Sequence, residues 1–276
     1  MIRQFYLVNG IGSTYFFDYR NQTLISNVGD LGFSKQNTFL SFDDEFVLVE
    51  SKNPQGSLAF EIVFLKGYAG YKEFISFLRK STDSLRLFYK CDNTLKYCYV
   101  TIKSISKSEL KSNTIQSSLT LDRLSLWLVK ETYEIKVAED KTGKIFPFIY
   151  PFNYSVSYKG IISINNDGDS KAPLNILING AVNNPIVEIL KDNEVISMMR
   201  LKVLSDNCII EINSASSNQF MNITEGGITK SIYQLQDFTC DNFLFIEKGI
   251  YQVRFTPGVT GDTICKITLL KGYVGQ

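Results

Sequence analysis

The 276-residue sequence predicts a mostly β protein with one large or two ordinary domains. Residue pairs typical of turns recur at short spacing, and apolar residues alternate with polar ones between them. Many short strands at such spacing are typical of β-sandwiches and barrels. The turn signals include Asn9-Gly10, Asp92-Asn93, Asp167-Gly168, Asn184-Pro185, Gly226-Gly227 and Pro257-Gly258. A single segment has helical spacing instead.

The chain opens with a strand-like run that ends at Asn9-Gly10. The sequence Gly10-Ile11-Gly12 lacks the third glycine of a dinucleotide-binding loop and is followed by aromatic residues, so it predicts a hairpin turn. Residues 41–53 then combine acidic and apolar side chains, which makes them a candidate extended hairpin. Its apolar residues are candidate contacts with another subunit or a partner, and the alternative is packing within the chain. These residues are Phe42, Phe46 and Leu48.

A strand and a helix follow. Leu58, Phe60, Ile62 and Phe64 alternate with other residues, which predicts a strand with one buried face. Within residues 71–80, apolar positions recur at helical spacing over about three turns. We expect this helix to cover an open barrel end or a sheet face, and a helix that binds a partner is the alternative.

Residues 85–100 predict a hairpin around Asp92-Asn93. Alternation then resumes at Leu119 and Leu121, and it changes parity at Asp122-Arg123, which predicts a bulge. The single tryptophan, Trp127, lies in the alternating run that follows. We expect Trp127 to be a buried structural anchor rather than a sugar-binding platform.

A domain boundary is expected in residues 140–151, where a turn and two prolines stand among aromatic residues. The prediction is a first domain over residues 1–145 and a second over residues 146–266. The aromatic stretch after the boundary supplies further candidate contacts with a subunit or partner. These residues are Phe146, Phe148 and Tyr150.

The second half is most clearly patterned in residues 165–190, where a polar turn leads into two β-type runs separated by a corner. We expect Pro173 and Pro185 to be structural anchors in these runs. The polar turn crowds carboxylate and amide oxygens around Gly168, as calcium loops do. Aligning Gly168 with the sixth position of an EF-hand loop puts Leu174 where a bidentate Glu is needed, so an Asx turn is predicted instead.

Composition excludes several functions. The 29 basic and 28 acidic residues balance, so no basic excess indicates nucleic-acid binding. We expect no secretory signal and no membrane insertion, and therefore synthesis in a cytoplasm, because no long apolar run occurs. The five cysteines form an odd set without CxxC spacing, which favours free buried thiols over disulfides or a metal site.

Catalytic chemistry is not indicated. The chain has no histidine, so nucleophile pairs with histidine and HExxH zinc sites are absent. Short SxxK, SDN and KTG matches occur as in penicillin-binding enzymes, but KTG precedes SDN here, whereas it comes last in that family. The acidic run Asp43-Asp44-Glu45 suits a solvated loop better than a glycosidase pair. We therefore expect no enzyme activity and no cofactor or metal.

Taken in order, these elements resemble the distal tail protein family of long, non-contractile-tailed phages. Residues 5–10 resemble its opening strand, residues 29–33 its glycine-containing loop, and residues 71–77 its lone helix. Residues 85–100 are similar to the hairpin that follows and residues 124–128 to the strand with the tryptophan. In the second half, the resemblance lies in Ala172-Pro173, in Asn184-Pro185, and in residues 241–249.

The resemblance implies a split-barrel or sandwich domain with one helix, followed by a galectin-like β-sandwich. It also implies that the last strand, within residues 267–276, returns to the first domain. The implied function is a structural hub at the tail tip, in which a homohexameric ring joins the tail tube to the host-adsorption device. The implied partners are the tail tube protein, a tail-tip lysin, and receptor-binding or baseplate proteins, assembled in the host bacterial cytoplasm.

A second hypothesis is a carbohydrate-binding β-sandwich protein that acts alone at a host surface. It predicts a monomer or small oligomer with measurable glycan affinity. The chain has no room for the large carbohydrate-binding insertions of some relatives, so we expect a partner to recognise sugar.

The balanced charge also suits a channel that passes DNA without holding it.

Overall fold

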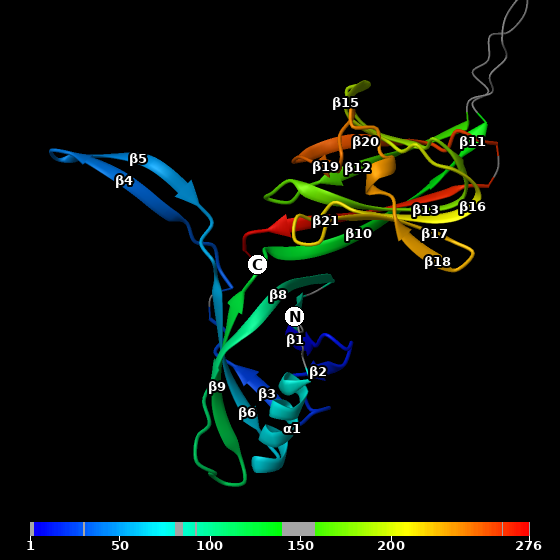
Figure 1. The fold of residues 1–276 in the computed structure, drawn as a ribbon. Helices are drawn as coiled ribbons and strands as arrows, with labels where there is room; N and C mark the ends of the chain where they lie inside the picture. The colour runs from blue at the N-terminus through cyan, green and yellow to red at the C-terminus, as the bar shows by residue number, and fades with distance from the viewer. Residues whose placement is uncertain are drawn as a thin grey trace, which may run out of the picture. The chain divides into compact units, whose positions relative to one another are not determined.

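The computed structural model describes residues 3–29, 31–80, 85–91, 93–139, 158–260 and 262–275. The described chain is mostly β-strand with one α-helix, as the sequence predicts (Figure 1). It divides into two compact units. The first contains residues 1–129 and 273–276, and the second contains residues 130–272. The predicted boundary between residues 145 and 146 lies outside the described residues.

The first unit is built on strands that pair in the order β2-β1-β7-β8, with β8 continuing to β9, β6 and β3. The long β8 joins the two halves because its first part pairs with β7 and its last part with β9. The elements are β1 (Arg3–Val8), β2 (Thr14–Phe16), β3 (Thr23–Ser26), β4 (Gln36–Phe42), β5 (Glu45–Lys52), β6 (Ser57–Phe64), α1 (Tyr68–Arg79), β7 (Leu85–Cys91), β8 (Thr94–Ile105), β9 (Ile115–Arg123) and the start of β10 (Trp127–Lys136).

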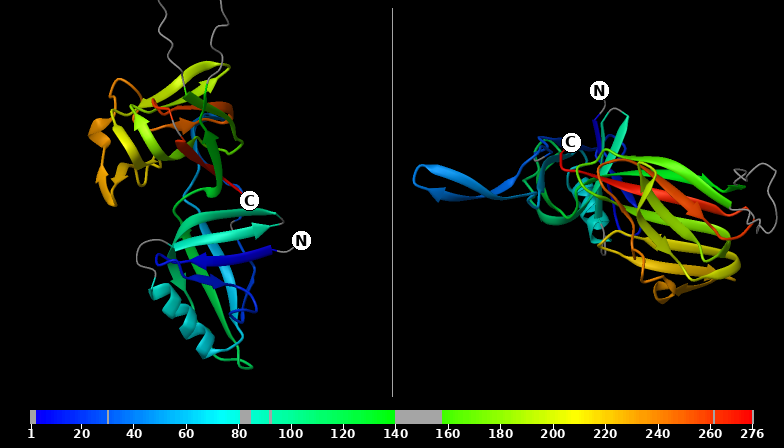
Figure 2. Two further views of the ribbon diagram at one scale, coloured as in Figure 1. Left: turned by 90° about the vertical axis from the view of Figure 1, so that its right-hand side faces the viewer. Right: turned by 90° about the horizontal axis from the view of Figure 1, so that it is seen from above.

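The helix α1 covers the core of the first unit, as the helical spacing predicts. It begins at Tyr68, three residues before the predicted start, and Gly67 precedes it with a φ of 53°. Phe74 and Phe77 are buried and lie 4.8 and 5.4 Å from the ring of Tyr15 on β2. Figure 2 shows the helix beside the strands of this unit. The burial of this helical face favours the core role over partner binding.

The alternation of β6 is confirmed, since Leu58, Phe60, Ile62 and Phe64 are all buried. The predicted bulge at Asp122-Arg123 is wrong. Strand β9 pairs in unbroken register with β6 as far as Asp122 and then ends at Arg123. The change of parity therefore marks a break between β9 and β10. A register shift does occur nearby, between Ile102 and Ser104 of β8.

The second unit is a two-sheet sandwich. One sheet has the order β18-β17-β16-β13-β21-β10, the other has the order β11-β12-β20-β14-β15, and β19 pairs with β13. The elements are β11 (Ala138–Glu139), β12 (Tyr158–Asn166), β13 (Ala172–Asn183), β14 (Ile186–Lys191), β15 (Glu194–Arg200), β16 (Leu204–Asn213), β17 (Phe220–Glu225), β18 (Ile228–Ser231), the short 3-10 helix η1 (Tyr233–Leu235), β19 (Phe245–Ile246), β20 (Gly249–Thr256) and β21 (Ile264–Tyr273).

Each unit has its own apolar core. In the second unit, inward side chains from both sheets meet, including Ile176 and Ile267 from one sheet and Ile189 and Val253 from the other. These residues alternate with outward ones along their strands, as expected for a sandwich. Residues up to Gly272 of β21 belong to this unit, and residues 273–276 belong to the first.

Candidate interaction surfaces

Strands β4 and β5 form a separate two-stranded sheet that pairs with no other strand of the described chain (Figure 1). Phe42 lies opposite Glu45, and Asp43 and Asp44 form the turn between them, with a φ of 51° at Asp43. The predicted extended hairpin is therefore present, but it begins at Gln36 rather than at residue 41. The acidic run lies at its exposed tip, as expected for a solvated turn.

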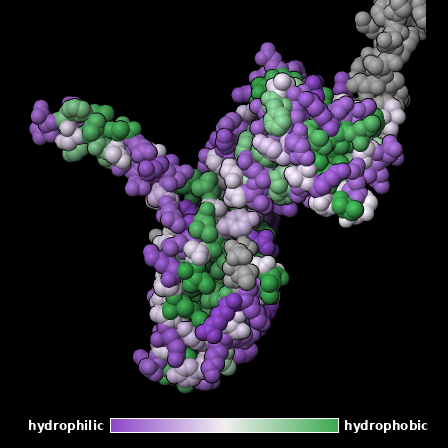
Figure 3. All heavy atoms as spheres, in the orientation of Figure 1, coloured by the Kyte–Doolittle hydropathy of each residue, from purple (hydrophilic) through white to green (hydrophobic). Residues whose placement is uncertain are grey.

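The hairpin carries apolar side chains on both faces. Successive side chains of a strand point to opposite faces, so the pairing shows which residues share a face. Phe39, Phe46 and Leu48 share one face, according to the pairs Phe39–Leu48 and Ser41–Phe46. Leu40, Phe42 and Val47 share the other face, together with Glu45 and Glu50. All of these side chains are exposed, including Phe42 at 60%, Phe46 at 73% and Leu48 at 52%. Figure 3 shows hydrophobic atoms along the hairpin and hydrophilic atoms at its tip.

Such exposure is unfavourable for an isolated chain. An apolar side chain gains about 1.5–3 kcal/mol when it is fully removed from water. Contiguous apolar surface rimmed by polar residues is a feature of interaction sites. An isolated two-stranded hairpin is also only marginally stable in water. The two faces of the β4–β5 hairpin are therefore candidate binding surfaces, and Phe42, Phe46 and Leu48 lie within them.

A second surface crosses four strands of the first unit. Tyr6 stacks on Phe88 with ring centroids 4.7 Å apart, and Phe16 and Tyr97 extend the row at 5.1 and 5.2 Å. We call Phe16, Tyr6, Phe88 and Tyr97 the aromatic row. These side chains are partly exposed, because the alternate residues of the same strands, such as Phe5 and Leu87, fill the core.

Sequence analysis missed the aromatic row. Phe5-Tyr6 and Phe88-Tyr89 are adjacent aromatic pairs, and one member of each pair points away from the core. Two adjacent aromatic residues in a strand are a usable signal for such a row, because their side chains point to opposite faces of the sheet. The register that aligns them across strands comes only from the fold.

Cationic side chains border the aromatic row. The guanidinium of Arg20 lies 3.4 Å from the ring centroid of Phe16, and that of Arg86 lies 5.8 Å from the ring centroid of Phe88. Burial raises the pKa of Tyr97 to about 12, with Tyr99 adding to the rise and Arg86 opposing it. Tyr97 is therefore an uncharged hydroxyl at neutral pH. Asp18 is the acidic neighbour of this surface, and it pairs with Arg20.

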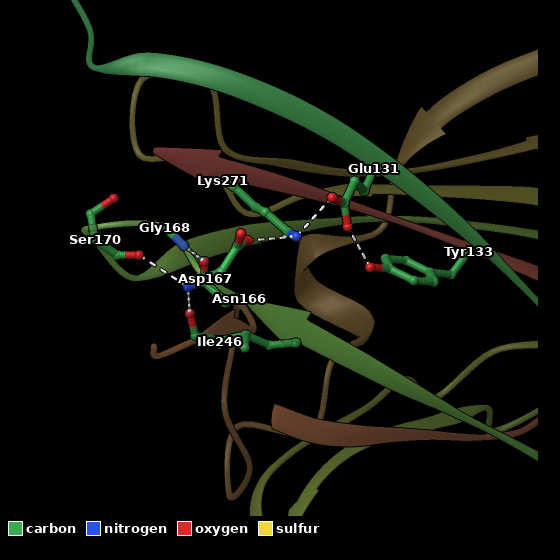
Figure 4. A network of polar contacts seen from close by, with 8 residues as sticks. All are labelled: Glu131, Tyr133, Asn166, Asp167, Gly168, Ser170, Ile246 and Lys271. Carbon is green, nitrogen blue, oxygen red and sulfur yellow. Dashed lines mark hydrogen bonds and ion pairs between the residues drawn. The ribbon is translucent and has the colours of Figure 1, made fainter. Parts of the chain in front are cut away.

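The second unit contains a polar network around Lys271 (Figure 4). The ammonium group lies 2.7 Å from Glu131 and 2.8 Å from Asp167, and the side chain is 5% exposed. Burial disfavours its charge, but the hydrogen bonds to Asp167 and Glu131 outweigh this effect and raise the pKa of Lys271. The amine stays protonated at neutral pH and is not a nucleophile.

The polar turn next to Lys271 is an Asx turn, as predicted. Asn166 Oδ1 accepts a hydrogen bond from the Gly168 amide at 3.1 Å, and Asn166 Nδ2 donates to the carbonyls of Ser170 and Ile246 at 3.0 and 2.9 Å. The carboxylate of Asp167 points to Lys271 (Figure 4). Within the described residues, no group of His, Cys, Asp and Glu side chains has the arrangement of a metal site.

The five thiols are free. Cys91 lies opposite Thr94, and Cys98 lies opposite Leu87, so the β7–β8 hairpin keeps the two cysteines apart as expected. Burial raises the pKa of Cys98 to about 12, with Arg123 opposing the rise, and burial raises that of Cys265 to about 12 as well. These buried thiols are protonated at neutral pH, whereas a catalytic cysteine must be a thiolate at that pH.

The remaining predicted residues lie in several places. Trp127 is fully buried in the core of the first unit, with its ring centroid 6.2 Å from that of Tyr89. Pro173 lies in β13 opposite Phe245 of β19. Pro185 is buried, and its carbonyl accepts a hydrogen bond from the Leu201 amide at 3.1 Å. Three predicted contacts lie outside the described residues, namely Phe146, Phe148 and Tyr150.

No helix in the described parts of the chain has the length and apolar character needed to cross a membrane. A search of curated proteins found no match.

Comparisons with solved structures cover the whole chain. A structure of the phage P2 baseplate in its activated conformation with Ca contains a chain that is 18% identical, with a TM-score of 0.69 and coverage of 100% of both chains. The corresponding structure with Sr gives 17% identity and a TM-score of 0.69, again covering 100% of both chains. The SPP1 Dit (gp 19.1) protein, described as a paradigm of the hub adsorption apparatus in phages that infect Gram-positive hosts, gives 8% identity and a TM-score of 0.62. That comparison covers 98% of this chain and 99% of the other. At these identities, the likeness establishes a shared fold.

A family comparison supplies the identity of the first unit. Residues 4–124 match the N-terminal domain of the distal tail protein. The match includes the β4–β5 hairpin, the helix α1 and all four residues of the aromatic row. Residues 4–124 are therefore similar to the N-terminal domain of the distal tail protein, and the whole chain shares its fold with the phage structures above.

Proposed function

We propose that the chain is the repeating subunit of a homohexameric ring in the distal tail hub. The observation that carries this proposal is the β4–β5 hairpin, which exposes apolar side chains on both faces. A closed ring gives each subunit two different neighbours through heterologous contacts. Such contacts bury the hairpin without any catalytic group. The similarity of residues 4–124 to the N-terminal domain of the distal tail protein supports a place for this subunit in a phage tail.

In this ring, the first unit forms an annulus that continues the tail tube. The second unit, proposed to be a galectin-like sandwich, holds receptor-binding or baseplate proteins and the tail-tip lysin. The ring joins the tube to the host-adsorption device at the tail tip, after assembly in the host bacterial cytoplasm. Within it, Phe42, Phe46 and Leu48 contact a neighbour or partner, and Phe146, Phe148 and Tyr150 do the same. Trp127, Pro173 and Pro185 hold the subunit fold, and the subunit has no enzymatic role.

The test is the mass of the purified chain in solution. Light scattering over a concentration series, with negative-stain images, is expected to give a ring of about 190 kDa, six times the 31.3 kDa chain, with a central pore. A chain that keeps its single-chain mass at every concentration contradicts the proposed ring. A glycan array on the same sample then tests the hypothesis of a lone carbohydrate-binding protein.

A further inference from the structure

The two faces of the β4–β5 hairpin differ in charge. Phe39, Phe46 and Leu48 lie on one face, and the residues opposite them across the two strands are uncharged. The other face carries Glu45 opposite Phe42, and Glu50 opposite Thr38. The two carboxylates are thus separated by four residue steps along the partner strand, which is about 13 Å at 3.3 Å per residue. Leu40 and Val47 form an apolar pair between them.

The aromatic row has the complementary pattern. Arg86, Phe88 and Lys90 alternate on the outer face of β7, because Leu87 and Tyr89 between them are buried. The two cations are also four residue steps apart, about 13 Å. Tyr6 and Tyr97 flank Phe88 on the adjacent strands. Each surface therefore has two like charges with apolar residues between them. The spacing is the same on both surfaces, and the charges of one surface are opposite in sign to those of the other.

From this match we infer that the Glu45–Glu50 face of one subunit's hairpin docks on the aromatic row of a second copy, with the carboxylates facing Arg86 and Lys90. This inference rests on the proposed ring and specifies its contact. The apolar contribution comes from Leu40, Phe42 and Val47 packing on aromatic rings. The charges set the register of the hairpin, because opposite charges attract and a shifted register leaves a carboxylate without its cation.

The acceptor surface is available for such a contact. Among the described residues, Asp18 is an acid beside the aromatic row, and Arg20 neutralises it through a contact of 2.5 Å. On the hairpin, Glu50 has a local partner in Lys52 at 3.3 Å, but both side chains are more than half exposed. An exposed ion pair of this kind is worth little and exchanges readily for a pair at an interface. The uncharged hairpin face stays free for a different partner.

Charge reversal on each surface tests the contact. The doubly substituted hairpin chain, Glu45→Lys with Glu50→Lys, and the doubly substituted acceptor chain, Arg86→Glu with Lys90→Glu, each place like charges in contact. Each is expected to raise the concentration needed for half-assembly at least about tenfold. Mixing the two chains pairs opposite charges again, so rings with alternating subunits are expected. The chain with all four substitutions is expected to assemble alone.

A matched control for the acceptor chain carries the same change of charge elsewhere on the first unit. Lys66→Glu with Lys72→Glu alters two exposed cations beside and on α1, and normal assembly is expected. Circular dichroism of every variant checks that it folds. A benzoylphenylalanine photo-crosslinker at Phe42 then locates the contact, and crosslinks to peptides of β1, β7 or β8 of another copy are expected.

The outcomes separate the two proposals. If both charge-reversed chains assemble into rings as readily as the wild-type chain, the docking contact is wrong and the ring proposal stands. Crosslinks from Phe42 to peptides outside these strands have the same meaning. Failure of the mixed chains to assemble, when each is folded, also overturns the contact. A wild-type chain that never exceeds its single-chain mass contradicts the ring itself, and the docking contact with it.

Discussion

At the residue scale, Lys271 is a cation with little access to water that is held by two partly exposed carboxylates. It joins β21 to Glu131 of β10 and to Asp167 in the turn after β12. Tyr133 donates a hydrogen bond of 2.5 Å to Glu131. Removing one member of a buried ionic group leaves its partners without compensation. The network therefore stabilises the sandwich rather than serving a reaction.

We predict that Lys271→Met lowers the free energy of unfolding by about 2 kcal/mol, less than the 3–5 kcal/mol of fully buried pairs because both carboxylates keep water. Urea denaturation measures this change. The matched control is Lys266→Met, since Lys266 is 48% exposed and lies 3.5 Å from Glu134. We expect the control to change stability by at most about 0.5 kcal/mol. Equal losses in both variants contradict a special role for Lys271.

The pH dependence of this contribution has a definite sign. The pKa of Lys271 is raised above its usual value of 10.5, so the folded state holds the proton more tightly than the unfolded state. The contribution is complete below 10.5 and is lost as the pH rises through the folded pKa. Wild type and Lys271→Met should therefore differ equally at pH 7 and pH 9 and converge only in more alkaline solution.

At the element scale, the β4–β5 hairpin gains nothing from its exposed phenylalanines in the isolated chain. We predict that Phe46→Ala changes the free energy of unfolding by at most about 0.5 kcal/mol at concentrations where the chain is monomeric. Phe60→Ala is the matched control, because Phe60 also lies in a strand of the first unit but is 2% exposed. Its expected cost is about 3–5 kcal/mol.

Urea unfolding of both variants measures these energies. A similar loss for Phe46→Ala and Phe60→Ala means that the hairpin already packs against the chain, which contradicts its availability for partners. Light scattering of Phe46→Ala at high concentration adds a second measurement, because loss of assembly without loss of stability assigns Phe46 to an interface.

Sequence patterns predict elements better than they predict their surroundings. The helix and the strand of Leu58 to Phe64 have regular periods that local residues determine. The change of parity at Asp122-Arg123 was misread because a bulge and a strand end produce the same shift in pattern. The exposed hairpin was predicted as an element, but its exposure on both faces depends on the packing of the rest of the chain. The aromatic row needed the register of four strands, which is a long-range property.

At the scale of the whole molecule, the described chain has two separate cores. The single tryptophan, Trp127, lies in the first core, so its fluorescence reports the first unit, whereas far-ultraviolet circular dichroism reports both. Strand β10 begins at Trp127 and continues into the second unit. The whole chain unfolds in one cooperative step only if the coupling free energy through this continuous strand exceeds the difference in stability between the two cores.

We predict that the cores unfold separately, because the buried apolar side chains of each unit form a cluster of their own. Ile189→Ala removes a fully buried side chain from the second core, and Leu87→Ala does the same in the first. Each should cost its own unit about 2–5 kcal/mol. In urea, Ile189→Ala should move the dichroism transition and leave the tryptophan transition unchanged, whereas Leu87→Ala should move the tryptophan transition. If Ile189→Ala also moves the tryptophan transition, β10 couples the units into one cooperative fold, and a force on the second unit would then be transmitted to the first.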